Sequence, residues 1–460
     1  MADARPFHWE YRPEPVERTA FRIEGGRPLI GTVSISGAKN AALKLLAAAT
    51  LTGERCRFTN VPEIEDVRVM AGTLRDLGVV VDHPAQNVYE VASGDVEWLF
   101  VPLEAAAKMR ASFMLLGPLL SRFGRVIISN PGGDRIGRRP VNLHVDAMRA
   151  LGAEIEYRNG YYFARSPGRL RGSEVTFPFV TVMGTENAML AAVLADGRTV
   201  IRPAAQEPEV DDLIACLQKM GAQIERTSPE TIEIEGRKRL RGAEHRVVAD
   251  RIEAGTFAVA AAVTGGRLML QGADAHHVDA LLEVMAAAGV GVELGEGGLT
   301  IQGRPAGEGA YRAVDIETAP YPGLATDLQP PVCVLLTQAR GESKVHEAVF
   351  EDRLEFLGEL ARMGADVTIA DPHHARIVGP RPLHGADVEI GDLRAGASLI
   401  LAALAANGTT TIHGAHHVHR GYENIERKFL DLGARIERIA EGSDSTGAAA
   451  DGTVDAGQSA

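Results

Sequence analysis

The chain has 460 residues, more than one ordinary hydrophobic core requires and enough for two or three domains. Its 45% hydrophobic and 24% charged content is that of a globular protein, and its formal net charge of -13 argues against a nucleic-acid-binding protein, because phosphate backbones favour broad basic surfaces. The three cysteines lie far apart, and no apolar stretch approaches the roughly 20 residues of a membrane helix, so we expect a cytoplasmic protein without disulfides or a membrane partner.

The two ends of the chain differ in composition from the residues between them. Residues 1–20 lack the apolar segment of a secretory signal, and we expect them to form a loosely ordered lead-in. Residues 441–460 are rich in Gly, Ala, Ser and Asp and contain almost nothing to bury, which predicts a disordered tail.

One short pattern recurs six times along the chain. In each copy, a stretch with helical periodicity ends at a glycine and is followed by alternating strand residues, as in KMGAQIER. The glycine fits the position just after a helix, where a left-handed conformation costs it little. Successive glycines are 68 to 75 residues apart, which is too long for a solenoid and suits two domains of three units each. The six glycines are Gly78, Gly152, Gly221, Gly289, Gly364 and Gly433.

Each unit also contains an earlier helix followed by a turn and a strand, as in GTFAVAAAVTGGRLMLQG. The earlier helices are apolar on nearly all sides and should be buried, whereas the later helices are amphipathic and should lie outside. We therefore predict an α/β fold of six repeated βαβαβ units around pseudo-threefold axes, with the helices inside and the sheets outside. A symmetric scaffold without chemistry is the alternative interpretation.

The buried helices begin with polar or charged residues. Helix N-termini expose free N–H groups and the positive end of a dipole, so they attract anions. If three such ends converge in each domain and the two domains face each other, they enclose an anion-attracting cleft. The residues at these helix starts are Lys39, Asn40, Arg110, Thr185, Glu186, Arg251, Glu253, Asp327, Asp392 and Arg394.

Eight short motifs, in order along the chain, resemble those of the UDP-N-acetylglucosamine 1-carboxyvinyltransferases. They are SGAKNAAL, PGGDRIGRRPVNLH, EPEVDD, DRIEAGTF, TDLQ, FEDR, DLRAGAS and RGYENIE, and the resemblance covers residues 21–437. It implies a two-domain inverted α/β barrel-like fold, with residues 39–249 in one domain and residues 21–38 and 250–440 in the other. It also implies transfer of the enolpyruvyl group of phosphoenolpyruvate to the 3′-hydroxyl of UDP-N-acetylglucosamine, in cell-wall precursor synthesis, by a monomer that needs neither a cofactor nor a metal.

The resemblance assigns the phosphoenolpyruvate side of the cleft to cationic residues. Lys39 and Asn40 match a pair at a helix start, and Arg139 and Arg420 match two family arginines. Guanidinium groups suit the oxygens of carboxylate and phosphate. Lys39 and Arg420 are expected to act in catalysis as well as in binding.

Asp134 lies in the glycine-rich segment PGGDRIGRRP, which we expect to be a mobile lid. Most family members have a cysteine at this position, and that cysteine is their general acid and the target of the epoxide antibiotic fosfomycin. A carboxylic acid can supply the proton if burial raises its pKa, although Arg135, Arg138 and Arg139 would oppose that shift. The resemblance therefore implies that Asp134 is the general acid and that the protein is insensitive to fosfomycin.

The same resemblance places the acceptor on the other side of the cleft. Asp327 matches the family aspartate that faces the sugar hydroxyl and is a candidate general base. Several positions depart from the family pattern, among them Met183 after Thr181 and Val182, and these leave two alternatives open: an acceptor that is another nucleotide, or a non-catalytic paralogue that binds nucleotide sugars. The expected substrate-binding residues are Lys39, Asn40, Arg110, Arg139, Pro140, Val141, Asn142, Leu143, Thr181, Val182, Asp327, Val349, Arg353, Arg394 and Arg420.

Overall fold

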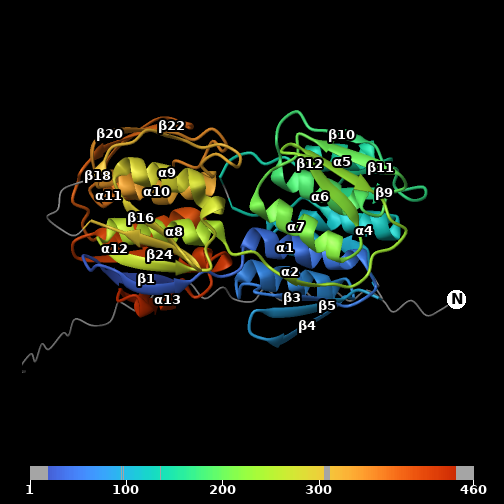
Figure 1. Ribbon diagram of the computed structural model, residues 1–460, viewed down its shortest axis with the longest axis horizontal. Coiled ribbons are helices and arrows are strands. Elements are labelled where there is room, and N and C mark those ends of the chain that lie inside the picture. The colour runs from blue at the N-terminus through green and yellow to red at the C-terminus, as the bar shows by residue number, and fades with distance from the viewer. Residues whose placement is uncertain (1–18, 95, 97, 135, 305–310, 442–460) are drawn as a thin grey trace, which may run out of the picture.

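The computed structural model describes residues 19–94, 96, 98–134, 136–304 and 311–441. Most of the predicted lead-in and tail, and Arg135 of the predicted lid, therefore lie outside the described residues. Figure 1 shows two lobes side by side, with helices in the interior of each lobe and strands around them. The first strand of the chain, β1, lies in the lobe that contains the C-terminal half.

Three buried helices form the centre of each lobe, as the apolar composition of these segments predicts. In one of the two longest, every residue from Arg251 to Ala262 is buried. Two of the six follow directly on a 3₁₀ turn, at Arg110–Leu115 (η2) and Thr326–Leu328 (η4). The inner helices are α1 (Lys39–Ala48), α4 (Leu116–Phe123) and α6 (Val182–Ala192) in one lobe, and α8 (Arg251–Val263), α10 (Gln329–Thr337) and α12 (Leu393–Ala405) in the other.

A second set of helices lies nearer the surface, and each of them ends close to one of the six repeated glycines. All six glycines are left-handed, with φ between 89° and 97°, which confirms the predicted helix ends. These helices are α2 (Glu65–Asp76), α5 (Asn142–Ala150), α7 (Pro208–Lys219), α9 (Asp279–Ala288), α11 (Leu357–Arg362) and α13 (Ile425–Asp431). Short helical turns complete the chain at α3 (Leu103–Ala106), η1 (Ala49–Leu51), η3 (Ala275–Val278) and η5 (Ala415–Arg420).

The strands form six small mixed sheets, three in each lobe. Each sheet has parallel strand pairing at one edge only, and its other neighbouring strands are antiparallel. In the first lobe the orders are β14 (Glu244–Arg246), β3 (Cys56–Thr59), β5 (Val88–Ala92), β4 (Val80–Ala85); β6 (Phe100–Val101), β7 (Arg125–Ser129), β9 (Tyr161–Arg165), β8 (Glu154–Arg158); and β10 (Glu174–Thr176), β11 (Arg198–Arg202), β13 (Thr231–Glu235), β12 (Gln223–Ser228).

The second lobe repeats this arrangement, with one additional short strand. Its sheets are β2 (Ile30–Ser34), β15 (Arg267–Gln271), β17 (Gly298–Gln302), β16 (Gly291–Gly295); β18 (Tyr311–Arg312) and β19 (Ile316–Glu317) beside β20 (Ala339–His346), then β22 (His374–Gly379), β21 (Asp366–Asp371); and β23 (Asp387–Glu389), β24 (Thr409–His413), β1 (Thr19–Glu24), β25 (Arg435–Ala440). The predicted fold class is confirmed. Each unit ends in a β-hairpin, and so has one strand more than the predicted unit.

The two lobes have separate hydrophobic cores. One consists of residues between 38 and 247, and the other of residues 21–35 and 252–436. The two chain crossings between the lobes lie side by side: Ala38 N–H donates to the carbonyl of Val248 at 2.7 Å, and Asp250 N–H donates to the carbonyl of Ser36 at 2.8 Å. Two cores with this division support the predicted domain boundaries at 39–249 and at 21–38 with 250–440, which we keep as a proposal.

Candidate active site

A buried carboxylate, Asp66, holds two of the predicted catalytic cations together. Lys39 is the first residue of α1, Asp66 lies in the first turn of α2, and Arg420 ends η5 in the other lobe. Lys39 Nζ is 2.8 Å from Asp66 Oδ2, and Arg420 Nε is 3.0 Å from Asp66 Oδ1. Burial opposes ionisation of Asp66, but the charges of Lys39 and Arg420 keep its pKa below the ordinary value. The site therefore presents one buried anion between two cations.

Asp134 joins this cluster through the predicted lid. Its carboxylate forms an ion pair with Arg420, and its backbone carbonyl accepts a hydrogen bond from Arg139. Two further bonds join the lid to the second lobe: Asp352 N–H donates to the carbonyl of Ile136 at 3.3 Å, and Arg138 N–H donates to a Glu351 carboxylate oxygen at 3.2 Å. The structure thus brings Asp134, Lys39, Arg139 and Arg420 together with the lid in contact with both lobes.

The lid depends on a glycine that cannot be replaced without moving the backbone. A Cβ atom on Gly132 would lie 1.9 Å from the carbonyl oxygen of Ala107. Gly132 N–H also donates to the carbonyl of Ala106 at 2.9 Å, which fixes this close approach. The glycine content of the segment therefore serves a tight contact at the start of the lid.

Asp327 lies in a second ion-pair cluster, in the second lobe. Arg353 contacts its carboxylate, and Arg394 Nε is 3.1 Å from Asp327 Oδ2. Arg353 is only 2% exposed and also pairs with Asp392 at 3.3 Å. Burial opposes ionisation of Asp327, but the charges of Arg394 and Arg353 hold its pKa well below the ordinary value. In this arrangement Asp327 is a stable anion, and it becomes a stronger base only if an anionic substrate draws these arginines away.

Arg110 and Arg139 differ from the other arginines of the site because no carboxylate of a described residue lies within ion-pair distance of either. Arg110 donates to the backbone carbonyls of Arg139 and Pro140, the latter at 3.2 Å. Burial and the nearby charge of Arg139 lower the pKa of Arg110 to about 10, and burial also lowers the pKa of Arg139. Two partly desolvated guanidinium groups that form no ion pair with a described carboxylate are a favourable site for an anion.

A cavity of about 380 Å³ adjoins these two arginines. Its walls include Pro140, Val141 and Asn142 of the predicted acceptor segment, together with Tyr162 and Arg149, which the sequence did not indicate. Five of the expected substrate-binding residues thus line one cavity.

The remaining predicted residues occupy less central positions. Thr181 is the N-cap of α6, where its hydroxyl accepts from Gly184 N–H at 3.4 Å, and Val182 and Leu143 pack against the first core. Val349 is 37% exposed, and its backbone N–H donates to Glu347. Asn40 is half-buried in the first turn of α1. Among the described residues, none of these side chains forms a hydrogen bond with the arginine clusters.

Sequence reasoning did not assign Asp66 to the site. An aspartate in the first turn of an amphipathic helix has an ordinary structural role, because it complements the helix dipole. Only the fold shows that Asp66 faces Lys39 and Arg420 instead. Sequence reasoning noted Asp392 at a helix start, and the structure gives it two roles: it caps α12 and pairs with Arg353.

We searched the described residues for metal-binding clusters and for membrane-spanning helices. No three His, Cys, Asp or Glu side chains among them are arranged to hold a metal ion. No helix in the described ranges is long and apolar enough to span a bilayer.

Residues 23–429 match the EPSP synthase family (3-phosphoshikimate 1-carboxyvinyltransferase). A solved structure of the enolpyruvyl transferase NikO from Streptomyces tendae superposes with a TM-score of 0.83 at 26% identity, over 92% of this chain and 99% of that one. EPSP synthase from Acinetobacter baumannii has a TM-score of 0.73 at 20% identity, over 92% of this chain and 100% of the other, and shows the fold alone. Fold and site together define an enolpyruvyl (carboxyvinyl) transferase.

Curated relatives place the chain more narrowly. The UDP-N-acetylglucosamine 1-carboxyvinyltransferase of Caulobacter vibrioides (strain NA1000 / CB15N) is 47% identical over 425 residues, which cover 91% of this chain and 97% of the relative. The enzyme of the same name from Paramagnetospirillum magneticum (strain ATCC 700264 / AMB-1) is 44% identical over 429 residues, which cover 92% and 98%. The chain belongs to the UDP-N-acetylglucosamine 1-carboxyvinyltransferase family, which confirms the predicted resemblance.

Proposed function

We propose that this enzyme transfers the enolpyruvyl group of phosphoenolpyruvate to the 3′-hydroxyl of UDP-N-acetylglucosamine, a step in the synthesis of peptidoglycan precursors. The names of its relatives support this acceptor. The observation that carries the proposal is the pair Arg110 and Arg139, two half-buried cations without an ion-pair partner among the described residues, beside a cavity and next to Asp134. Both substrates are anions and would supply the missing negative charge.

The reaction has two balanced steps. In the first, the sugar oxygen forms a bond to C2 of phosphoenolpyruvate, C3 gains a proton, and the hydroxyl loses its own proton to a base. In the second, the bond between C2 and the phosphate oxygen breaks, C3 loses a proton, and inorganic phosphate leaves with the enol ether as the other product. The protein must therefore bind a phosphate and a carboxylate, and it must hold an acid and a base near the reacting carbons.

Asp134 is the proposed acid, and its position supports that role. It lies in the same cluster as Arg420 and Lys39, which we assign to phosphoenolpyruvate, on a lid that bonds to both lobes. Binding of phosphoenolpyruvate to Arg420 would replace Asp134 as the counter-ion of that arginine and leave the Asp134 carboxyl group next to the bound substrate. Asp134 has no thiol to be alkylated, so we expect fosfomycin not to inactivate the enzyme.

Asp327 is the proposed base, held between Arg353 and Arg394. The anionic diphosphate and carboxylate of the substrates would compete for these guanidinium groups, and the pKa of Asp327 would then rise toward the range in which it can accept a proton. The expected cytoplasmic location and monomeric state remain predictions.

Another acceptor is the second candidate, and Met183 motivates it. Thr181, Val182 and Met183 stand at the start of α6, where the family has Ser-Val-Gly beside the nucleotide. A methionine side chain at this helix start changes the shape available to the acceptor.

Phosphate release by the full chain tests the proposal. We expect release from phosphoenolpyruvate only when UDP-N-acetylglucosamine is present, and loss of that release in Asp134→Asn, which keeps the shape of the side chain but cannot donate an acidic proton. Asp82→Asn is the matched control, because Asp82 lies on β4, is 52% exposed and does not line the cavity beside Arg110, so this variant should leave turnover unchanged. Turnover with a different uridine nucleotide alone would favour the second candidate. Wild-type turnover in Asp134→Asn would contradict the assigned acid.

A further inference from the structure

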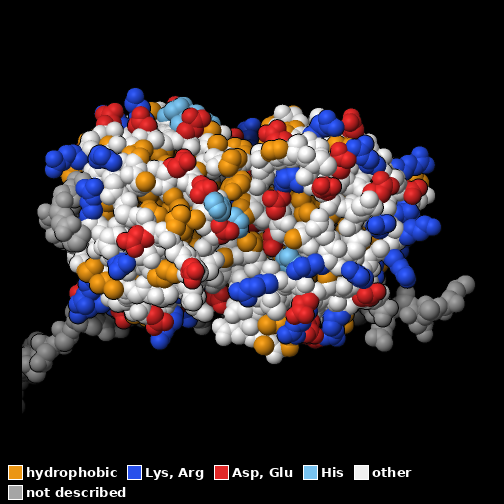
Figure 2. Space-filling model, viewed as in Figure 1, with side chains coloured by type: hydrophobic (Ala, Val, Ile, Leu, Met, Phe, Trp, Pro, Cys, Tyr) orange, Lys and Arg blue, Asp and Glu red, His pale blue; other side chains and the backbone are white. Residues whose placement is uncertain are grey.

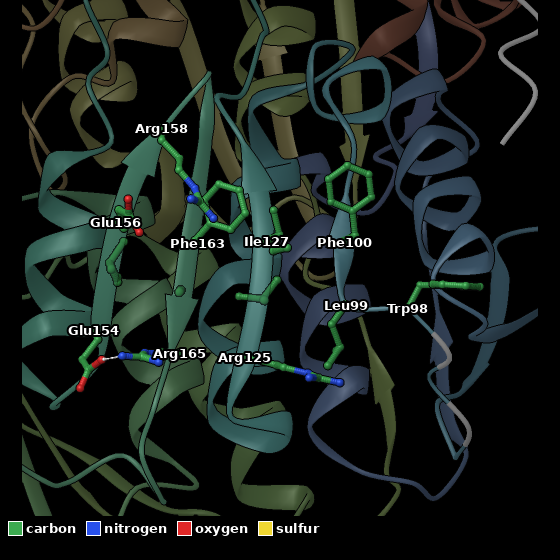
Figure 3. A pocket seen from close by; sticks show the side chains of 13 residues that line it. Trp98, Leu99, Phe100, Arg125, Ile127, Glu154, Glu156, Arg158, Phe163 and Arg165 are labelled. Carbon is green, nitrogen blue, oxygen red and sulfur yellow. Dashed lines mark hydrogen bonds and ion pairs between the residues drawn. The ribbon is translucent and has the colours of Figure 1, made fainter. Parts of the chain in front are cut away.

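A groove of about 780 Å³ lies on the outer face of the sheet β6-β7-β9-β8 and contains none of the site residues discussed above (Figure 3). Alternate residues of these strands, such as Val126 and Ile128, face the core. The residues between them face outward, so Ile127 of β7 and Phe163 of β9 form an apolar pair at the centre of the groove. Phe100 continues this apolar strip on β6, where it is paired with Ile127.

The six-fold repeat of the chain provides an internal comparison for this surface. In each of the other five sheets, the central outward-facing pair on the corresponding two strands contains at least one polar side chain. These pairs are Arg57 with Glu90, Val200 with Glu233, Met269 with Thr300, Lys344 with Arg376, and Arg22 with Thr411. A central outward-facing pair that is apolar on both strands is therefore found in one of the six sheets and is not a property of the fold.

Charged side chains lie beside the apolar strip, and they differ in whether they form ion pairs. Arg165 pairs with Glu154 at 2.6 Å, whereas the guanidinium of Arg158 lies over the ring of Phe163, 4.3 Å from its centre. No carboxylate of a described residue lies within ion-pair distance of Arg125 or Arg158. Figure 3 shows these two arginines on opposite sides of the strip, where each can meet an acidic group of a partner.

The spacing of these groups matches an extended peptide. Arg125 is paired with Arg165, Ile127 with Phe163, and Arg158 with Tyr161, in successive rows along the strands. The outer two rows are four residues apart, or about 13 Å. A partner in the same extended conformation places every second side chain toward the groove, so an acidic, an apolar and a second acidic residue at positions i, i+2 and i+4 would meet the three rows.

We infer that this groove binds an extended segment of a partner protein in which two acidic side chains flank an apolar one. Aromatic residues and arginine are enriched at the centres of protein interfaces and lysine is depleted, and the lining follows that pattern. Of the two glutamates in the lining, Glu154 is paired with Arg165, and Glu156 lies opposite Phe163 in the central row, away from the rows of Arg125 and Arg158. Figure 2 shows acidic and basic side chains interspersed over both lobes.

The test uses the full chain and a fluorescein-labelled peptide, Gly-Glu-Thr-Leu-Thr-Glu-Gly, in an anisotropy titration. We expect saturable binding that weakens by about tenfold or more in Arg158→Glu and in Phe163→Glu, as for central interface residues. The same peptide with lysine in place of both glutamates should not bind. Arg198→Glu, on the equivalent strand β11 where Arg198 pairs with Glu233, is the matched control and should bind as the wild type does.

Turnover and melting temperature of each variant show whether the fold is intact, because the groove contains no proposed substrate residue. The inference is overturned if the acidic peptide does not bind, if the lysine peptide binds equally well, or if Phe163→Glu binds as tightly as the wild type. Self-association in sedimentation velocity that Phe163→Glu abolishes would assign the groove to a second copy of the chain and would also overturn it.

Discussion

Replacement of Asp66 by asparagine removes the one anion that Lys39 and Arg420 share. Asp66 is 4% exposed, and its carboxylate lies 2.8 Å from the lysine and 3.0 Å from the arginine. Asparagine keeps the size of the side chain, so the substitution changes charge and leaves packing nearly intact. A buried lysine and a half-buried arginine then face each other across a neutral amide, and Arg420 keeps its ion pair with Asp134 as the one remaining carboxylate contact among the described residues.

The expected decrease in the unfolding free energy of Asp66→Asn follows from the burial of these groups. Loss of one partner from a buried ion pair costs about 3–5 kcal/mol, because the remaining charge is left without compensation. Asp134 still neutralises Arg420 in part, so we expect the lower end, about 3 kcal/mol. For a domain of about 200 residues, 1 kcal/mol shifts the melting temperature by roughly 2–4 °C, so the variant should melt about 6–12 °C below the wild type.

Thermal unfolding with and without inorganic phosphate measures this effect. Phosphate supplies an anion to the exposed cations, so it should raise the melting temperature of Asp66→Asn more than that of the wild type. Asp82→Asn is the matched control, because Asp82 is 52% exposed and 3.4 Å from Arg55, and such surface pairs contribute about 0–1 kcal/mol. Equal melting temperatures for Asp66→Asn and Asp82→Asn, with equal responses to phosphate, would refute the reasoning.

Two further predictions concern the lid and a buried pair in the first core. Gly132→Ala forces a Cβ atom to within 1.9 Å of the Ala107 carbonyl oxygen and should lower kcat/KM for phosphate release by about tenfold or more. In the control Gly72→Ala, in α2, the added Cβ meets nothing within 4 Å, so this variant should preserve activity and add about 0.5–1 kcal/mol to the unfolding free energy. Equal kinetics of the two variants would contradict the role of Gly132. Lys44 is 3.3 Å from Glu186, and burial, opposed by the charge of Lys44, raises the pKa of Glu186 to about 7. A carboxyl group with a raised pKa contributes stability that is complete below the unfolded pKa of about 4.3 and is lost as pH rises toward 7. The unfolding free energy of the wild type should therefore fall over this range by up to roughly 3 kcal/mol relative to the double variant Lys44→Met with Glu186→Gln. Urea titrations at pH 5 and 8 that give the two proteins the same change in unfolding free energy would contradict this prediction.

Sequence patterns predicted the repeat because each unit has strong local signals. The glycine after each outer helix, such as Gly221 at φ 93°, satisfies a backbone requirement that few other residues meet. The inner helices are apolar on all sides, and α8 is buried along nearly its whole length. The hairpin that ends each unit was missed, although turns such as Asn159–Gly160 mark it, because its two strands read as one alternating stretch.

The sequence predicted a residue of the candidate site only where that residue belongs to a recognised motif. Lys39, Asp134 and Arg420 lie together as the resemblance implies, although they are far apart in sequence. Asp66 was not predicted, because its ion pairs cross between elements that no local pattern connects. The groove around Ile127 and Phe163 was not predicted for a related reason: whether an alternating strand turns its second face to solvent or to a partner depends on the neighbouring strands.

The central claim is that Asp134 replaces a thiol acid in an otherwise complete enolpyruvyl transferase. The most direct measurement is formation of the enolpyruvyl ether from phosphoenolpyruvate and UDP-N-acetylglucosamine, followed by mass spectrometry after preincubation with and without fosfomycin. We predict the same rate of product formation in both samples and no product from Asp134→Asn. Inactivation by fosfomycin, or full product formation by Asp134→Asn, would contradict the account.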